Sequence, residues 1–119
     1  MKKIIILILT GLILMLVPLS AQEMKASAVK EINITNKGLT FTPNEISVSK
    51  GDTVRITYTN AGGFHDLVID EFMVRTKQIK AGESDSFEFR ADKSGVFEFY
   101  CSVGNHRKMG MFGKLTVSE

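Results

Sequence analysis

Cysteine and histidine are scarce in this chain of 119 residues, which has one cysteine, Cys101, and two histidines, His65 and His106. A single cysteine cannot form a disulfide within its own chain, so a disulfide-stapled fold is excluded. The sequence also lacks a glycine loop of the kind that holds phosphates and a helix with paired carboxylates. Nucleotide chemistry and hydrolysis therefore have no support, and no small-molecule substrate is expected.

An excess of one charge sign is also absent. Lys and Arg number 15 against 13 Asp and Glu, a formal net charge of +2, and Lys2 and Lys3 account for the difference. A general attraction to nucleic acid or to acidic membrane surfaces is therefore not expected. Internal repeats, low-complexity tracts and linkers are missing too, which predicts one domain after the N-terminal segment.

The one long apolar run lies at the N-terminus. Lys2 and Lys3 precede the 14 residues of the run, 4–17, and small residues up to Ala21 follow it. The run is shorter than the about 20 residues that a membrane-spanning helix needs. This layout predicts a signal peptide at residues 1–21 and an exported protein, periplasmic or otherwise extracytoplasmic, with a retained membrane anchor as the alternative. Metal ligation would explain a lone thiol in such an oxidising compartment.

From Lys30 onward the pattern is that of strands. Short runs rich in Val, Ile, Thr, Phe and Tyr alternate with turn residues, at residues 31–36, 39–42, 46–48, 53–60, 67–69, 84–90, 96–101 and 113–118. The clearest run places Val54, Ile56 and Tyr58 on one face and polar residues on the other. The pattern predicts an all-β sandwich or barrel at residues 22–119, with the strand content of residues 70–81 left open.

Residues 97–117 carry Cys101, His106 and two methionines, Met109 and Met111. A thiolate, an imidazole and a thioether so close in sequence can face one metal ion if the loop folds back on itself. His65 lies 36 residues before Cys101, so the fold would have to add a second loop. Two imidazoles, a thiolate and a weak thioether are the ligands of a type 1 copper site. The alternative is a small core cysteine and two ordinary loop histidines.

The same residues resemble a known family. Residues 101–106 (CSVGNH) and 111–117 (MFGKLTV) resemble the ligand loop of the cupredoxins, the small blue copper proteins that include plastocyanin and azurin. Residues 41–48 (FTPNEISV) and 51–54 (GDTV) look like that family's opening hairpin, and residues 60–65 (NAGGFH) look like the loop of its first histidine. The resemblance implies a Greek-key β-sandwich of about seven to eight strands with copper at one end.

Carried over residue by residue, the resemblance implies that His65, Cys101 and His106 are the strong copper ligands and Met111 the weak axial ligand. Met109 competes for the axial position, but Met111 is the methionine that leads into the last predicted strand. The spacing is a hybrid. The four residues between Cys101 and His106 are azurin-like, and the four between His106 and Met111 are plastocyanin-like.

Asp66 departs from the family pattern, since many members have Asn after the first histidine. An ionised carboxylate accepts hydrogen bonds but cannot donate them. Two roles stay open for Asp66. It is either an acceptor that steadies the ligands from behind or a solvated loop residue.

The resemblance implies a protein that is not an enzyme and that binds one copper ion, cycles between Cu(I) and Cu(II) and shuttles single electrons. Its partners would be redox proteins, a cytochrome or another metalloprotein, that dock on a monomer near His106. Arg107 and Lys108 suit a partner with local negative charge, or are solvated surface. The expected apolar rim of this electron port consists of Gly62, Phe64, Gly104, Met109, Gly110 and Phe112.

Two other functions use the same residues. One is a periplasmic copper-binding or copper-delivery protein that prefers Cu(I) and has no electron-transfer role. The other is an enzyme in which Cys101, His106 and Asp66 act as nucleophile, base and orienting group. The enzyme is disfavoured because Cys101 is predicted to point inward and no second lobe is present to bind a substrate.

Overall fold

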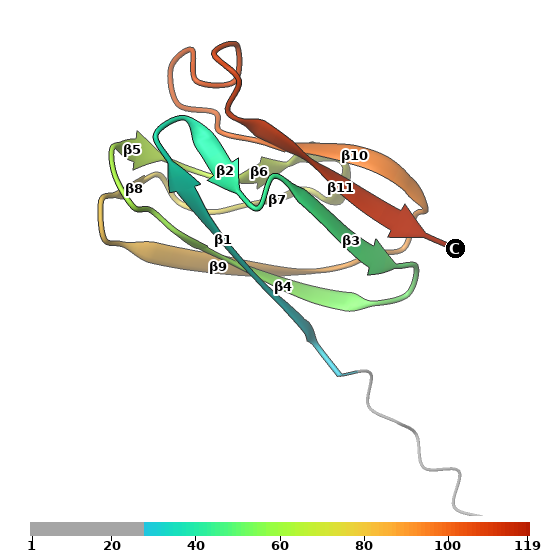
Figure 1. The fold of residues 1–119 in the computed structure, drawn as a ribbon. Coiled ribbons are helices and arrows are strands. Elements are labelled where there is room, and N and C mark those ends of the chain that lie inside the picture. Colours follow the sequence, from blue (N-terminus) through green and yellow to red (C-terminus); the bar gives the residue numbers. More distant parts are fainter. Residues whose placement is uncertain (1–27) are drawn as a thin grey trace, which may run out of the picture.

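The computed structural model describes residues 28–119, which form a β-sandwich (Figure 1). One short 3-10 helix, η1, interrupts the strands. In chain order the elements are β1 (Lys30–Lys37), β2 (Thr40–Thr42), β3 (Glu45–Ser49), β4 (Thr53–Thr59), β5 (Phe64–His65), β6 (Val68–Ile69), η1 (Asp70–Phe72), β7 (Val74–Arg75), β8 (Ile79–Lys80), β9 (Ser84–Arg90), β10 (Gly95–Tyr100) and β11 (Phe112–Ser118).

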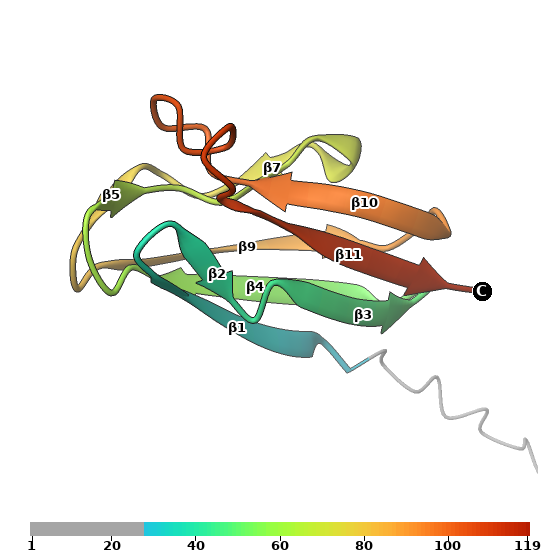
Figure 2. The ribbon, with the colours of Figure 1, turned by 45° about the horizontal axis from the view of Figure 1, so that its top comes forward.

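Two sheets form the layers of the sandwich. One has the strand order β2-β1-β4-β9 and the other β3-β11-β10-β6-β7, while β5 and β8 form a separate antiparallel pair. In Figure 2, β10 and β11 of the second sheet lie over β4 and β9 of the first. Parallel pairing occurs twice, between β1 and β4 and between β3 and β11. Sequence neighbours therefore often lie in different sheets, and the chain crosses repeatedly between the layers.

The alternation of apolar and polar residues accounts for the strands. In β4 the side chains of Val54, Ile56 and Tyr58 are buried, and the residues between them face outward. A strand turns successive side chains to opposite faces, so one face of β4 enters the core and the other meets solvent. The same alternation occurs in β11, where Gly113, Leu115 and Val117 are the buried positions.

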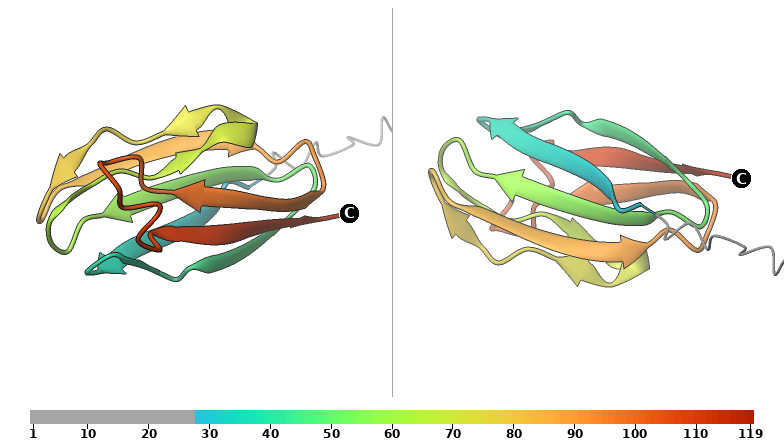
Figure 3. Two further views of the ribbon diagram at one scale, coloured as in Figure 1. Left: turned by 90° about the horizontal axis from the view of Figure 1, so that it is seen from above. Right: turned by 90° about the horizontal axis from the view of Figure 1, so that it is seen from below.

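The core between the sheets is continuous with one end of the sandwich. Phe41 packs at its centre, with ring centroids 5.6 Å from Tyr58 and 5.4 Å from Phe99. Cys101 and Met111 belong to the same buried cluster, and both are fully buried. The loop between β10 and β11, which begins at Cys101 and ends at Met111, lies at the same end of the sandwich as β5 and the β1–β2 turn (Figure 3).

The two-sheet, all-β architecture confirms the fold class, and the predicted run at residues 53–60 is β4. The prediction of about seven to eight strands is lower than the eleven present in residues 28–119. The predicted run at residues 67–69 is β6, and the three strands that were not predicted, β5, β7 and β8, are only two residues long, too short to leave a period-two signal. Residues 70–81, left open from the sequence, contain η1, β7 and β8.

The predicted signal peptide, residues 1–21, lies outside the described residues. Among residues 28–119, no helix has both the length and the apolar character to cross a bilayer.

Gly113 gives a test of the packing between β10 and β11. A methyl group at Gly113 would collide with the ring of Phe99 and with the backbone carbonyl of Asn44. Gly113→Ala should therefore lower the free energy of unfolding by about 1–3 kcal/mol, the usual cost of overpacking. Gly62→Ala is the control, because nothing lies within 4 Å of a Cβ there. Chemical unfolding of the metal-free protein measures both, and equal stabilities would contradict this packing.

Candidate metal centre

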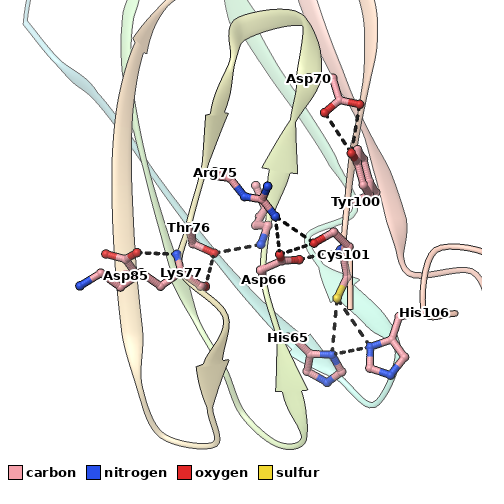
Figure 4. Close-up of polar contacts among 12 residues, drawn as sticks. His65, Asp66, Asp70, Arg75, Thr76, Lys77, Asp85, Tyr100, Cys101 and His106 are labelled. Carbon is pink, nitrogen blue, oxygen red and sulfur yellow. Dashed lines mark hydrogen bonds and ion pairs between the residues drawn. The ribbon is translucent and has the colours of Figure 1, made fainter. Parts of the chain in front are cut away.

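Three donor side chains meet at the end of the sandwich, as Figure 4 shows. The Sγ atom of Cys101 lies 3.8 Å from Nδ1 of His65 and 3.6 Å from Nδ1 of His106. The two Nδ1 atoms are 3.1 Å apart. Among the described residues these three form the one group of His, Cys, Asp or Glu close enough to hold a metal ion together.

The spacing fits one ion between three ligands. Metal–nitrogen and metal–thiolate bonds are about 2.0–2.3 Å long, which in a trigonal plane puts neighbouring donors about 3.5–3.8 Å apart. The two sulfur–nitrogen distances, 3.8 and 3.6 Å, match these values, and the two nitrogens are closer together, at 3.1 Å. The predicted alternative of a core cysteine with two unrelated loop histidines does not account for this convergence.

The two methionines of the loop occupy opposite environments. Met111 is fully buried, whereas the side chain of Met109 is 64% exposed. The backbone fixes Met111 beside the donors, because its N–H donates to the carbonyl of His106 at 2.9 Å and its carbonyl accepts from the N–H of Cys101 at 3.0 Å. The second bond closes the loop at its base.

The loop between Cys101 and Met111 is a succession of tight turns. The N–H of His106 donates to the carbonyl of Val103, and the N–H of Gly110 donates to that of Arg107, both at 3.1 Å. Gly110 has φ 104°, a conformation that is readily open only to glycine. These turns bring His106 back over Cys101.

Two buried asparagines position the loop that carries His65. The side chain of Asn60 donates to the carbonyls of Gly63 and Ile79, both at 2.9 Å. Asn36 accepts from the hydroxyl of Tyr58 at 2.9 Å and from the N–H of Ala61 at 3.0 Å. This role was not predicted, because nothing in the sequence pattern shows that the side chain of Asn60 is buried.

Gly63 is required by its contact with the ligand. A Cβ atom there would lie 2.7 Å from Nε2 of His65, and the φ of Gly63 is 82°. Any side chain at this position would therefore be strained and would push the imidazole out of place. The glycine pair before His65 thus has a steric reason as well as a turn-forming one.

Asp66 is fully buried and is an acceptor between the two ligand loops, which decides between its two predicted roles. It accepts from the N–H of Ser102 at 2.6 Å, from the hydroxyl of Ser102, and from Arg75 at 3.2 Å. Asp66 follows His65 and Ser102 follows Cys101, so this contact joins the neighbours of two donors. Neither Ser102 nor Arg75 was singled out from the sequence, and Arg75 lies in β7, a strand too short to predict.

Burial favours the neutral forms of Cys101 and His65. Burial raises the pKa of the Cys101 thiol, and the backbone N–H groups of Asp66 and Val103 oppose that rise. Burial lowers the pKa of His65, and the neighbouring His106 lowers it further. At neutral pH His65 therefore has a free lone pair for a metal, while Cys101 must lose a proton before it can bind one.

The rim of the site is apolar and open to solvent. An open hollow of about 480 Å³ beside the donors is lined by Gly38, Leu39, Gly62, Gly63, Phe64, His65, Val103 and His106. Phe64 and Phe112, two residues of the predicted rim, are 43% and 48% exposed. Leu39 was not predicted to line the hollow, because it comes from the β1–β2 turn, far from the ligand loops in sequence.

The chain is similar in sequence to known cupredoxins. A family model described as the Cupredoxin-like domain matches residues 6–117. Plastocyanin of Vicia faba is 33% identical over 98 residues, covering 73% of this chain and 96% of plastocyanin. Halocyanin of Natronomonas pharaonis is 33% identical over 85 residues, covering 69% of this chain and 50% of halocyanin, so this chain spans about half its length.

The fold is also similar to that of a solved protein. Reduced auracyanin from Roseiflexus castenholzii superposes with a TM-score of 0.68 at 24% identity, covering 76% of this chain and 98% of auracyanin. Together with the two imidazoles and the thiolate, the family match and the similarity to plastocyanin make copper the cofactor of a type 1 site, where His65, Cys101 and His106 lie within reach of one ion and Met111 is buried beside them.

Metal binding should release a proton from Cys101. Because the pKa of the buried thiol is raised, the metal-free protein holds this proton at neutral pH. Adding Cu(I) near pH 7 should release about one proton per ion bound, because cysteine binds a metal as the thiolate and not as the thiol. Titration in weak buffer with a pH indicator measures it. Cys101→Ser should release none, and equal release from both proteins would show that the proton comes from elsewhere.

Proposed function

This chain belongs to the cupredoxin family, and we propose that it is an exported electron carrier that moves single electrons between redox proteins. The observation that carries the proposal is the convergence of Cys101, His65 and His106 at the edge of an apolar core. In this proposal the three supply the strong ligands, and Met111 supplies the weak axial one. When bound, copper provides a one-electron couple, Cu(II)/Cu(I).

The protein's contribution is to hold the donors still. The turns before His106, the backbone bond between Cys101 and Met111, and the contact of Asp66 with Ser102 all join protein groups to one another. Donors fixed by the fold rearrange little between two oxidation states, so little energy is lost to reorganisation during transfer. This rigidity favours electron transfer over copper delivery, which would require the ligand loops to open and release the ion.

His106 is the proposed electron port. Its ring lines the apolar hollow together with Leu39 and Phe64, which gives a partner an apolar surface next to the metal. Arg107 lies near the port but is held by Glu98, at 2.6 Å, and its guanidinium is over the ring of Tyr100. Lys108 is exposed beside it. The protein would act as a monomer, and a cytochrome or another metalloprotein with local negative charge would dock on this surface.

Export is part of the proposal. Residues 1–21 have the layout of a signal peptide, and residues 22–119 would be the mature domain. A periplasmic or other extracytoplasmic location, with an anchor where cleavage fails, is consistent with a single free cysteine that is fully buried.

The protein is not an enzyme. Cys101 is fully buried, so it is closed to a substrate. Asp66 contacts Ser102 and Arg75 in place of orienting His106 as a base. Cys101, His106 and Asp66 are therefore not arranged as the nucleophile, base and orienting group of an enzyme.

Copper delivery remains the second candidate function, favoured by one observation. Met109 places an exposed thioether three residues after His106, and soft thioether donors select Cu(I). A surface methionine could bind Cu(I) as the ion enters or leaves the site. An electron carrier retains its copper ion and does not need such a residue.

The visible and EPR spectra of the copper-loaded protein separate the two functions. An electron carrier should show an intense thiolate-to-Cu(II) band that disappears on reduction and returns on oxidation. Cys101→Ser should abolish the band, because the thiolate is its origin. A colourless protein that binds only Cu(I) would exclude the electron carrier and favour delivery.

Paired methionine variants test the axial ligand. Met111→Leu and Met109→Leu both remove a thioether at nearly constant volume, which costs less than about 1.5 kcal/mol of stability. Met111→Leu should raise the reduction potential and change the EPR spectrum, because Cu(II) depends more than Cu(I) on an additional donor. Met109→Leu should leave both unchanged. The reverse result would assign the axial position to Met109.

A further inference from the structure

Asp66 and Arg75 form a charge pair directly behind the copper donors (Figure 4). The Asp66 side chain is fully buried, whereas that of Arg75 is 60% exposed. Arg75 donates to the carboxylate at 3.2 Å and to the Ser102 hydroxyl at 3.1 Å, and that hydroxyl donates in turn to Asp66. The three side chains close a ring of hydrogen bonds in which Asp66 is an acceptor only.

This ring replaces a neutral contact with a charged one. An asparagine at position 66 could join the same two loops, because its amide both accepts and donates. The carboxylate brings a negative charge as well, and its donors are supplied by Ser102 and Arg75. A buried charge is costly unless it is paired and hydrogen-bonded, and Arg75 provides the pairing.

Asp66 lies next to both donors. It follows His65 in the chain, and its carboxylate accepts from the N–H and the hydroxyl of Ser102, the residue after Cys101. Its side chain is fully buried, so solvent and salt screen its charge only weakly.

Such a charge must act on a redox couple. The oxidised site carries one more positive charge than the reduced site, so a nearby negative charge stabilises the oxidised form and lowers the potential. Arg75 offsets this effect in part. Because its guanidinium is largely exposed, solvent and salt screen it more than they screen Asp66.

We infer that Asp66 and Arg75 tie the two ligand loops together and, through their opposite charges, set the reduction potential of the site. The inference rests on the proposed electron-carrier function and adds two positioning residues to it, neither of which is a copper ligand. In this inference the contact that holds the two loops together also adjusts the reduction potential through its charges.

Reduction potentials of four proteins test the inference: the full-length wild type, Asp66→Asn, Arg75→Gln and the double variant, all copper-loaded. Asp66→Asn keeps an oxygen that can accept from the Ser102 N–H while it removes the charge, so the potential should rise. Arg75→Gln leaves the buried carboxylate uncompensated, so the potential should fall, by less than the rise. The double variant should lie between the two single variants.

Arg55→Gln is the matched control. Arg55 is also an exposed arginine that pairs with carboxylates, Glu31 and Glu88, but it lies on the outer face of β4. Its removal should leave the potential unchanged. Shifts of the same sign in Asp66→Asn and Arg75→Gln, or no shift in Asp66→Asn, would overturn the inference and reduce the pair to a structural tie.

Thermal unfolding of the metal-free proteins separates failure of this inference from failure of the proposed function. Arg75→Gln should lower the unfolding midpoint of the wild type and have a smaller effect in the Asp66→Asn background, because the charge pair is already broken there. An equal lowering of the midpoint by Arg75→Gln in the wild type and in Asp66→Asn would overturn the inference, even if the copper-loaded wild type has the blue thiolate-to-Cu(II) band. A wild type without the blue band would overturn the electron carrier and the tuning role together, whereas unmoved potentials in a blue protein would overturn the tuning role alone.

Discussion

The hydrogen bond between the N–H of Cys101 and the carbonyl of Met111, 3.0 Å long, fixes the geometry of this protein's ligand loop. It continues the pairing of β10 with β11, whose last register pair is Tyr100 with Phe112. The sheet therefore sets the distance between the thiol and the thioether before the loop begins. Within the loop, successive turns have only to bring His106 back over the sulfur.

The second loop is positioned by side chains rather than by the sheet. Asn36 and Asn60 hold the backbone around the Gly62–Gly63 pair, and Asp66 bonds to the residue after Cys101. Buried polar groups of this kind are tolerated when every partner is satisfied, and among the described residues no buried side-chain N or O atom lacks one. The polar network is the reason that His65, distant in sequence, has a defined place beside Cys101.

Electrostatics and packing act together at this end of the molecule. Cys101 and His65 are buried at the edge of the apolar core, which disfavours charge on these two donors in the metal-free protein. On the outer side, His106 opens onto an apolar hollow at the surface. The metal centre thus lies one side chain from solvent, and the proposed electron transfer to a docked partner would pass through His106.

The sequence by itself determined the donors and the fold class. With one cysteine and two histidines available, a copper site could be built in only one way from the strong ligands, and the alternation in runs such as residues 53–60 requires strands with one buried face. These features are local, so they can be read without coordinates.

Tertiary structure decided everything that depends on which segments become neighbours. It buried Met111 and exposed Met109, two residues apart, because the loop turns between them. It also brought Arg75, from a two-residue strand with no periodic signal, to the buried carboxylate of Asp66. Such contacts join positions far apart in the chain, and their formation depends on how the two sheets pack, which no short stretch of residues specifies.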